Sequence, residues 1–247
     1  KAERFPLKLV RCRACNHMFL AHPARREALF SNYPYPSGKS ETLAQYFSWL
    51  ASKVTNETVG NGTGAVEARP ALLEVARSDR SQLGEFKARG WKAFRVDPAE
   101  SLAALARNGS QGLASLLGSG TLHAIVAQGV LARVRKPVEF LKQCAALMGE
   151  HTKLYIQTSR CQMYQDGQFD TAHHEHVSFF TGHSFQRAAE LANLTIVKFE
   201  LTPIHGTSCL VTFQRKRSVA KSARLAPSLS QRLESERDAG ITHDFFY

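Results

Sequence analysis

From Pro70 onward, short apolar runs alternate with longer amphipathic segments, and this alternation constrains the fold more than any other feature of the sequence. The apolar runs are too short for helices and fit buried strands. Predicted strands cover residues 71–76, 91–96, 123–127, 153–157, 195–201 and 209–213. Predicted helices cover residues 81–89, 99–107, 137–148 and 184–192. Strands separated by helices predict an α/β fold, with a doubly wound, mainly parallel sheet covered on both faces.

The segments that flank this pattern carry weaker signals. Residues 1–40 show little periodicity, whereas residues 40–54 predict a helix, because apolar residues recur at helical spacing behind a serine cap. The glycine-containing stretch 55–69 predicts a loop. No strand is visible between residues 108 and 122, so we expect the sheet to be shortened there. The tail, residues 218–236, predicts a further helix.

The composition bounds the compartment and the partners. The chain has 247 residues, of which 43% are hydrophobic, and no run of eighteen apolar residues that would cross a membrane. Its formal net charge of +11 favours a polyanionic partner such as nucleic acid, an anionic membrane or a phosphorylated small molecule, unless the basic clusters are only solvated surface. Five scattered Cys residues argue against a disulfide framework. The chain also begins without the apolar core of a signal peptide, so we expect a reducing, cytoplasmic location.

Residues that directly follow the predicted strands are candidate ligand contacts, because a parallel sheet binds ligands beyond the carboxyl ends of its strands. Asp97 ends the second strand, where a carboxylate can accept hydrogen bonds from both ribose hydroxyls of a nucleoside cofactor. Its alternative role is to form the turn before Pro98. Gln128 ends the third strand. The loop 76–80 contains no glycine, although glycine lets a backbone approach a cofactor closely, so by itself this loop predicts no cofactor site.

Histidines crowd one segment downstream of the strand at 153–157. The segment reads Phe169-Asp-Thr-Ala-His173-His174-Glu175-His176. Its imidazoles suit proton transfer, because the ordinary pKa of histidine, about 6.5, lies close to neutral pH. A zinc site is a second interpretation, although adjacent ligands in one short segment rarely converge on one ion. A polar loop without chemistry is the third.

A Cys-x-x-Cys pair lies near the start of the sequence, at Cys12 and Cys15. This spacing is typical of one half of a four-ligand zinc site. No second such pair exists in the chain. Three interpretations stay open: a partner pair precedes residue 1, His17 and His22 complete the site, or the pair binds no metal.

Together these segments resemble the sugar C-methyltransferases of deoxysugar biosynthesis, in which a zinc-binding N-terminal module precedes a Rossmann-like class I methyltransferase core and a C-terminal domain. The similarity covers nearly the whole chain. Its most specific match is Phe169 to Phe180, which resembles the signature Phe-Asp-Thr-x-Tyr-His-Glu-His-x-Ser-Tyr-Phe. Tyr33 to Ser40 resembles Tyr-x-Tyr-x-Ser-Gly-x-Ser, and residues 72–83 stand in place of a Glu-Ile-Gly-Ser-Asn-Asp-Gly cofactor loop. Phe5 to Cys15 resembles the second half of the zinc module, and His205 to Ser208 a His-Gly-Gly-Ser turn.

The resemblance implies a reaction and the residues that perform it. A histidine base would remove the proton next to the carbonyl of a nucleotide-linked keto sugar, and the resulting enolate would attack the methyl group of S-adenosylmethionine. The implied catalytic residues are His176 as the base, Glu175 as its assistant, and His173. Implied cofactor contacts are Glu74, Ala76, Asp79, Asp97 and Gln128. Implied substrate contacts are Tyr33, Tyr35, Ser37 and His205, and implied zinc ligands are Cys12 and Cys15.

The resemblance also implies a domain order. Residues 1–40 would form a partial zinc module and a segment on the substrate side, residues 41–201 the methyltransferase core, and residues 202–247 the start of the C-terminal domain. We expect a small-molecule substrate and no membrane, while the oligomeric state is not predicted.

Several positions depart from the family pattern. Ala76 and Arg80 replace glycines of the cofactor loop, Ser78 replaces its Asn, Gln128 replaces the Asn after the family's fourth strand, and Arg133 replaces a nearby His. A degenerate, non-catalytic methyltransferase-like protein is therefore the alternative to an active enzyme. A basic zinc-module protein that binds nucleic acid is a second alternative, although the aromatic residues are not interleaved with the basic ones.

Overall fold

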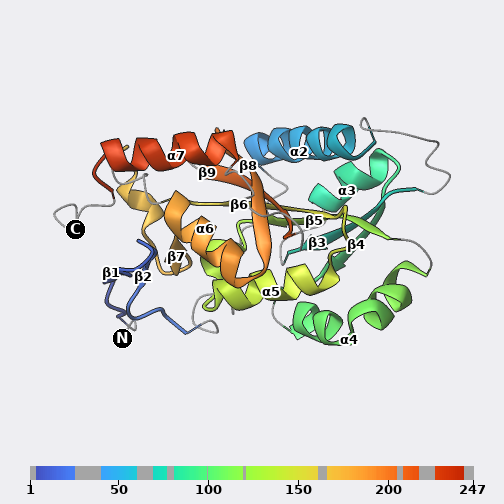
Figure 1. The fold of residues 1–247 in the computed structure, drawn as a ribbon, viewed down its shortest axis with the longest axis horizontal. Helices are drawn as coiled ribbons and strands as arrows, with labels where there is room; N and C mark the ends of the chain where they lie inside the picture. The colour runs from blue at the N-terminus through green and yellow to red at the C-terminus, as the bar shows by residue number, and fades with distance from the viewer. Residues whose placement is uncertain are drawn as a thin grey trace.

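A six-stranded sheet forms the centre of the computed structural model (Figure 1). The strands are β3 (Ala71–Val75), β4 (Lys92–Val96), β5 (Leu122–Gln128), β6 (Lys153–Thr158), β8 (Leu194–Thr202) and β9 (Ser208–Arg215). Their order across the sheet is β4-β3-β5-β6-β9-β8. The first four strands pair in parallel, whereas β9 pairs antiparallel with both β6 and β8. The structure describes residues 4–25, 40–59, 69–76, 81–98, 100–118, 121–160, 166–204, 208–216 and 226–241.

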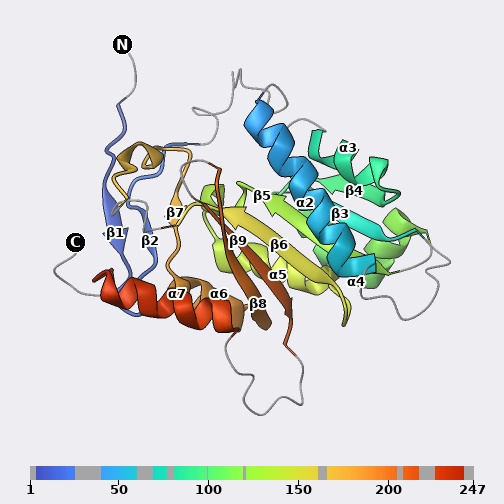
Figure 2. The ribbon, with the colours of Figure 1, turned by 90° about the horizontal axis from the view of Figure 1, so that it is seen from above.

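Helices cover both faces of this sheet. They are α2 (Glu41–Val59), α3 (Ser81–Ala88), α4 (Glu100–Leu117), α5 (Pro137–Leu147), α6 (Gly182–Leu191) and α7 (Pro227–Asp238). Figure 2 shows α2 running diagonally across the strands on one face, with α3 beside it, while α4, α5 and α6 lie on the other. Neighbouring residues of a strand therefore face opposite cores: Leu72 packs against the layer of α2, and Leu73 against the layer of α5. The predicted doubly wound α/β fold is confirmed.

Three elements differ from their predicted extents. Helix α4 continues to Leu117 through a kink at Gly109, whose φ of 50° and ψ of −126° are not helical, so this helix occupies most of the stretch where a strand was not visible. Helix α2 ends at Val59, five residues later than predicted, because a polar stretch without proline can extend a helix that its apolar face already anchors. Strand β9 lies inside the sheet, so the sheet itself reaches beyond the core boundary expected at residue 201.

A second, three-stranded sheet joins the start of the chain to the histidine segment. Strands β1 (Leu9–Arg11) and β2 (Met18–Leu20) form a hairpin, and β2 pairs in turn with β7 (Ser178–Phe179). Met18 lies opposite Phe179 in this pairing, and both side chains are buried. The backbone just before β7 is therefore held by residues more than 150 positions away in the sequence, which local periodicity does not reveal.

A capping box fixes the chain where β7 leads into α6. The Thr181 hydroxyl accepts from the Ser184 N–H at 3.0 Å, and the Ser184 hydroxyl accepts from the Thr181 N–H at 2.8 Å. Because Thr181 is fully buried, loss of its hydroxyl leaves the Ser184 N–H unpaired. We expect Thr181→Ala to lower the free energy of unfolding by about 1–2 kcal/mol. Urea unfolding measures this change, and Thr181→Ser is the matched control that keeps the cap; equal losses in both variants would contradict the capping role.

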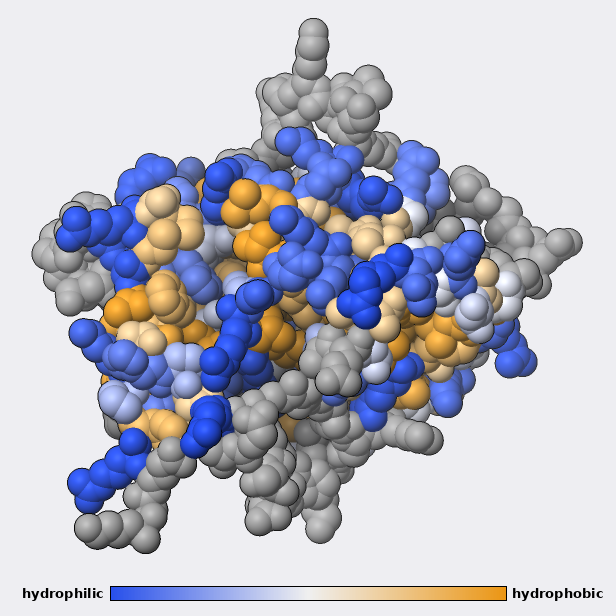
Figure 3. Space-filling model, turned by 90° about the horizontal axis from the view of Figure 1, so that it is seen from below, coloured by the Kyte–Doolittle hydropathy of each residue, from blue (hydrophilic) through white to orange (hydrophobic). Residues whose placement is uncertain are grey.

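Across the residues that the structure describes, every helix is too short or too polar to cross a bilayer. On the lower face in Figure 3, hydrophilic and hydrophobic residues are interspersed among the coloured atoms.

Candidate active site

The strand order creates a switch point at the carboxyl edge of the sheet. After β3 the chain crosses to β4 on one side, and it later returns to β5 on the other side of β3. Helices consequently leave β3 and β5 towards opposite faces, and a crevice is expected where such strands end. The residues that the sequence placed after β3, β4 and β5 are Ala76, Asp97 and Gln128, and the structure brings all three to this edge.

Asp97 follows the last residue of β4, next to the end of β3. The N–H of Ala76 donates to the carbonyl of Val96 at 3.1 Å, so Ala76 and Asp97 are held at neighbouring strand ends. The Asp97 carbonyl accepts from the N–H of Leu102 at 3.0 Å, which fixes the backbone at the start of α4. Strand β3 separates Asp97 from Gln128, so the two residues flank the switch point from opposite sides.

Glu74 points away from solvent beneath this edge. Its side chain is 2% exposed, and its carboxylate accepts from Arg95 Nε at 3.1 Å. A buried carboxylate that lost such a partner would be strongly destabilised, so this contact has a structural consequence whatever else Glu74 binds. Arg95 was not anticipated from the sequence, because only the register of β3 against β4 places it opposite Glu74.

Gln128 is held by a residue from α2. The Tyr46 hydroxyl donates to Gln128 Oε1 at 2.9 Å, while Gln128 Nε2 is buried without a hydrogen-bond partner in the described part of the chain. The next residue, Gly129, has a φ of 63°, and its N–H donates to the Gln157 carbonyl at 3.0 Å. A buried amide donor without a partner is costly, and a polar ligand atom at this edge would satisfy it.

His176 lies beyond the end of β6, at the same edge of the sheet. Its Nδ1 is 3.2 Å from the Thr171 carbonyl and 3.4 Å from the Ser159 hydroxyl. A carbonyl oxygen only accepts, so the contact with Thr171 requires a proton on Nδ1, and the basic lone pair of a neutral ring then belongs to Nε2. The His176 N–H also donates to the His173 carbonyl at 3.0 Å, which fixes the turn that carries the ring.

A second imidazole contacts His176, and an ion pair belongs to the same segment. The rings of His173 and His176 have centroids 4.2 Å apart, and Glu175 forms an ion pair with Arg133 at 3.3 Å. Arg133 belongs to the short helix η2 (Leu131–Arg133) that follows β5. Burial and the positive charge of Arg133 lower the pKa of His173, against the opposing effect of Glu175. The segment thus combines a neutral imidazole, a half-buried imidazole of fixed tautomer and an ion pair.

The charge of Arg133 gives a prediction for the titration of His173. We expect Arg133→Gln to raise the pKa of His173, because the variant removes a nearby cation that pairs with Glu175. The reciprocal variant Glu175→Gln should lower this pKa. The midpoint of the His173 imidazole resonances in an NMR pH titration measures both shifts. Shifts of the same sign in the two variants would show that Arg133 and Glu175 do not set the charge state of His173.

Five of the predicted site residues lie outside the described residues. They are Tyr33, Tyr35, Ser37, Asp79 and His205. Their expected roles in binding substrate and cofactor stay predictions. Ser208, which follows His205 closely, is described, and its hydroxyl accepts from Gln157 Nε2 at 2.8 Å at the end of β6.

Cys12 and Cys15 lie at the tip of the β1–β2 hairpin. The Cys12 N–H donates to the His17 carbonyl at 2.8 Å, which closes the turn. Hydrogen bonds from the N–H groups of Ala14 and Cys15, together with the Cys15 thiol, lower the pKa of Cys12, whereas burial raises that of Cys15. Across the described residues, no three His, Cys, Asp or Glu side chains gather closely enough to hold a metal ion. Two thiols do not make a four-ligand zinc site, so we derive no role for zinc.

Three contacts of the site were missed by the sequence analysis. Tyr46 reaches Gln128 from α2, Ser159 touches His176 from the end of β6, and Arg133 pairs with Glu175. Arg133 was recognised only as a departure from a family pattern. Tyr46 carried no signal of its own, because an aromatic residue at helical spacing normally indicates core packing.

Comparisons with known proteins show the family to which the chain belongs. A family described as a methyltransferase domain matches residues 59–198, which is more than half of the chain. The chain belongs to this methyltransferase domain family. It is also similar to the C-methyltransferase NovU of Streptomyces niveus, with 25% identity over 255 residues that cover 98% of this chain and 59% of that protein. The chain therefore spans less than two thirds of the length of this relative.

Two solved structures with a similar course of the chain are the following. One is the 1,6-didemethyltoxoflavin-N1-methyltransferase of Burkholderia thailandensis, with a TM-score of 0.48 and 14% identity, covering 81% of this chain and 96% of that chain. Another is the mitomycin 7-O-methyltransferase MmcR, with a TM-score of 0.44 and 11% identity, covering 72% of this chain and 59% of that one.

Proposed function

We propose that this protein is an S-adenosylmethionine-dependent C-methyltransferase that acts on a nucleotide-linked keto sugar or a similar carbonyl substrate. The observation that carries the proposal is the placement of His176 at the carboxyl edge of the sheet, with Nδ1 held by the Thr171 carbonyl. The similarity to a C-methyltransferase supports transfer to carbon. The family that matches residues 59–198 supports methyl transfer itself.

The proposed chemistry begins with a proton transfer to His176. A carbonyl acidifies the neighbouring C–H, and an imidazole with its lone pair on Nε2 removes that proton, a contribution of typically 10²–10⁴-fold to the rate. Thr171 holds the ring in the required tautomer. Glu175, anchored by Arg133, places negative charge beside the segment and favours the imidazolium that forms. His173, neutral because of its lowered pKa, adds no repelling charge.

The residues at the switch point fit the proposed cofactor. Asp97 would accept hydrogen bonds from ribose hydroxyls, and the buried Nε2 of Gln128 would donate to a polar cofactor atom. When bound, S-adenosylmethionine supplies the electrophilic methyl group that the carbanion receives. Alignment of the two reactants at this edge supplies much of the remaining rate enhancement.

The absence of glycine from residues 76–80 favours a second candidate, a degenerate protein that keeps the fold without the chemistry. A side chain at each of these positions limits how closely the backbone can approach a ligand. The described part of this loop, Ala76, is buried and already hydrogen-bonded to Val96.

Calorimetry with S-adenosylmethionine separates the two candidates. An active enzyme should bind the cofactor, and it should also exchange the hydrogen next to the substrate carbonyl for deuterium in D₂O without cofactor, because His176 acts before methyl transfer. Mass spectrometry of a nucleotide-linked keto sugar measures this exchange and the gain of a methyl group. Cofactor binding without deuterium exchange or methyl transfer would reject the proposed substrate class. Failure to bind the cofactor would favour the degenerate protein over the active enzyme.

A further inference from the structure

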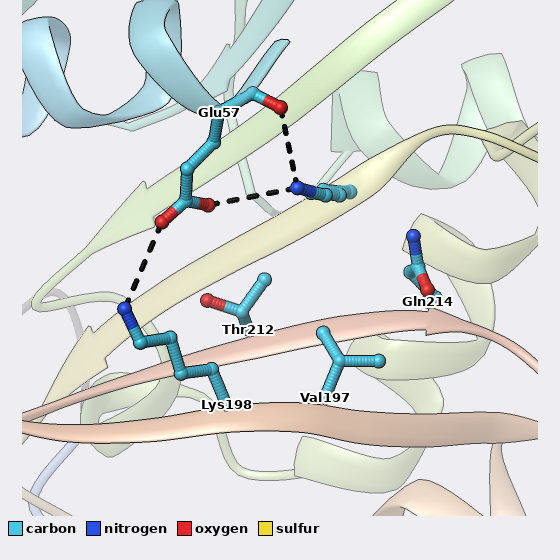
Figure 4. Close-up of a pocket in the computed structure, with 6 residues that line it drawn as sticks. Glu57, Val197, Lys198, Thr212 and Gln214 are labelled. Atoms are coloured by element: carbon cyan, nitrogen blue, oxygen red, sulfur yellow. Dashed lines mark hydrogen bonds and ion pairs between the residues drawn. The ribbon is translucent and has the colours of Figure 1, made fainter. Parts of the chain in front are cut away.

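A pocket of about 410 Å³ lies on the face of the sheet that carries α2, away from the histidine segment. It is lined by Glu57, Lys153, Val197, Lys198, Thr212 and Gln214. Figure 4 shows Glu57 and Lys198 reaching towards each other across the opening, with Thr212 and Gln214 on the strand beneath. This volume lies within the range of roughly 300–1,000 Å³ that is typical of small-molecule sites.

The walls of the pocket carry more positive than negative charge. Lys53, Lys153 and Lys198 share the two carboxylates Glu57 and Glu200, so three cations face two anions and one positive charge is left over. Hydrogen bonds from Lys53 and Tyr155 outweigh the burial of Glu57 and lower its pKa, so this carboxylate stays ionised. A neutralising anion would complete the cluster.

The two lysines that line the pocket lie beyond hydrogen-bond distance of the Glu57 carboxylate. Lys198 Nζ is 3.9 Å from Glu57 Oε1, and Lys153 Nζ is 3.7 Å from Oε2. Both separations exceed the usual length of an N–H···O hydrogen bond. Glu57 is satisfied instead by Lys53 at 2.7 Å and by the Tyr155 hydroxyl at 2.8 Å. Lys198 Nζ pairs instead with Glu200 Oε1 at 2.9 Å, a carboxylate that Lys53 also contacts at 2.9 Å. Either lysine can therefore turn towards a ligand while Lys53 still pairs with both Glu57 and Glu200.

A buried hydroxyl supplies a second, independent sign of a ligand. Thr212 is 1% exposed, and its Oγ1 has no hydrogen-bond partner within the described residues. The residue lies on β9, opposite Lys198 in the register with β8. In Figure 4 its oxygen is directed to the side of Lys198. A buried hydroxyl without a hydrogen-bond partner is unfavourable, and an acceptor atom of a ligand bound in the pocket would satisfy it.

We propose that this pocket binds the phosphate group of a phosphorylated small molecule. The phosphate oxygens accept from Lys153 and Lys198 and from the Thr212 hydroxyl, while Gln214 and Val197 contact the rest of the molecule. Phosphate fits because its several acceptor oxygens match donors that come from different strands. The pocket is larger than a phosphate group alone requires, so the ligand carries an organic part.

The pocket is separate from the proposed reaction site. Lys153 begins β6, whereas the His176 partner Ser159 follows its end, so the length of the strand lies between them. The proposed ligand is therefore neither the cofactor nor the methyl acceptor. The site goes beyond the proposed function, and its occupancy does not depend on methyl transfer.

Calorimetric titration with ribose 5-phosphate, inorganic phosphate and ribose tests the proposal. We expect ribose 5-phosphate to bind with a Kd below about 1 mM, inorganic phosphate to bind more weakly, and ribose not to bind. Lys198→Gln should weaken ribose 5-phosphate about tenfold through loss of a charge-assisted hydrogen bond. Thr212→Val should weaken it about threefold to tenfold. Because Val has the same shape and the hydroxyl is unpaired, this variant should keep the Tm of the wild type.

Lys142→Gln is the matched control, because it removes one lysine from an exposed position on α5, on the other face of the sheet. It should bind ribose 5-phosphate as the wild type does. Saturation with S-adenosylmethionine should leave the affinity unchanged. The proposal is overturned if ribose 5-phosphate does not bind at about 10 mM. It is equally overturned if Lys198→Gln and Thr212→Val bind like Lys142→Gln, or if ribose binds as well as its phosphate.

Discussion

Replacing His176 by alanine should lower methyl transfer by about 10²–10⁴-fold, the usual contribution of a general base. Binding of S-adenosylmethionine should change by less than about twofold, because the imidazole acts on the acceptor carbon and not on the cofactor. Exchange of the substrate hydrogen for deuterium should fall with the methyl transfer, because both begin with the same proton removal. The Thr171 carbonyl accepts a hydrogen bond from Nδ1, which places this function on Nε2.

Single-turnover rates and cofactor calorimetry on the same protein measure the two effects separately. His151→Ala is the matched control, because His151 is exposed and lies two residues before the amino end of β6, at the opposite edge of the sheet. Full activity in His176→Ala would remove His176 from the mechanism. A loss of cofactor binding as large as the loss of rate would show that His176 supports the fold of the site and not the chemistry.

Local periodicity was sufficient to predict the six strands of the central sheet. The inner parallel strands β3, β5 and β6 are almost continuously buried, because a parallel sheet is covered on both faces, and this pattern differs clearly from the helices between them. The kinked α4 was less visible, because Gly109 interrupts its helical pattern with a residue that disfavours helices. Strand β7 was missed for another reason: two residues do not establish a period, and β7 exists through its pairing with β2.

From the sequence, the position of a candidate site residue could be predicted only where that residue ends a strand. Asp97 and Gln128 end their strands, so a parallel sheet necessarily brings them to one edge. The partners that hold the site come from other elements: Tyr46 from α2 reaches Gln128, and Arg133 from η2 reaches Glu175. Such contacts depend on helix packing and on the course of loops, which a single sequence does not specify.

Asp97→Ala should weaken the binding of S-adenosylmethionine by about tenfold to hundredfold, because a carboxylate that accepts two ribose hydroxyls contributes charge-assisted hydrogen bonds. The backbone contact that starts α4 should remain in the variant, because it uses the Asp97 carbonyl. At saturating cofactor the rate of proton removal by His176 should stay close to that of the wild type. Calorimetry measures the affinity, with Asp238→Ala at the exposed end of α7 as the control for loss of one carboxylate. Unchanged affinity in Asp97→Ala would identify Asp97 as the turn former before Pro98 and would move the cofactor contacts elsewhere along the edge.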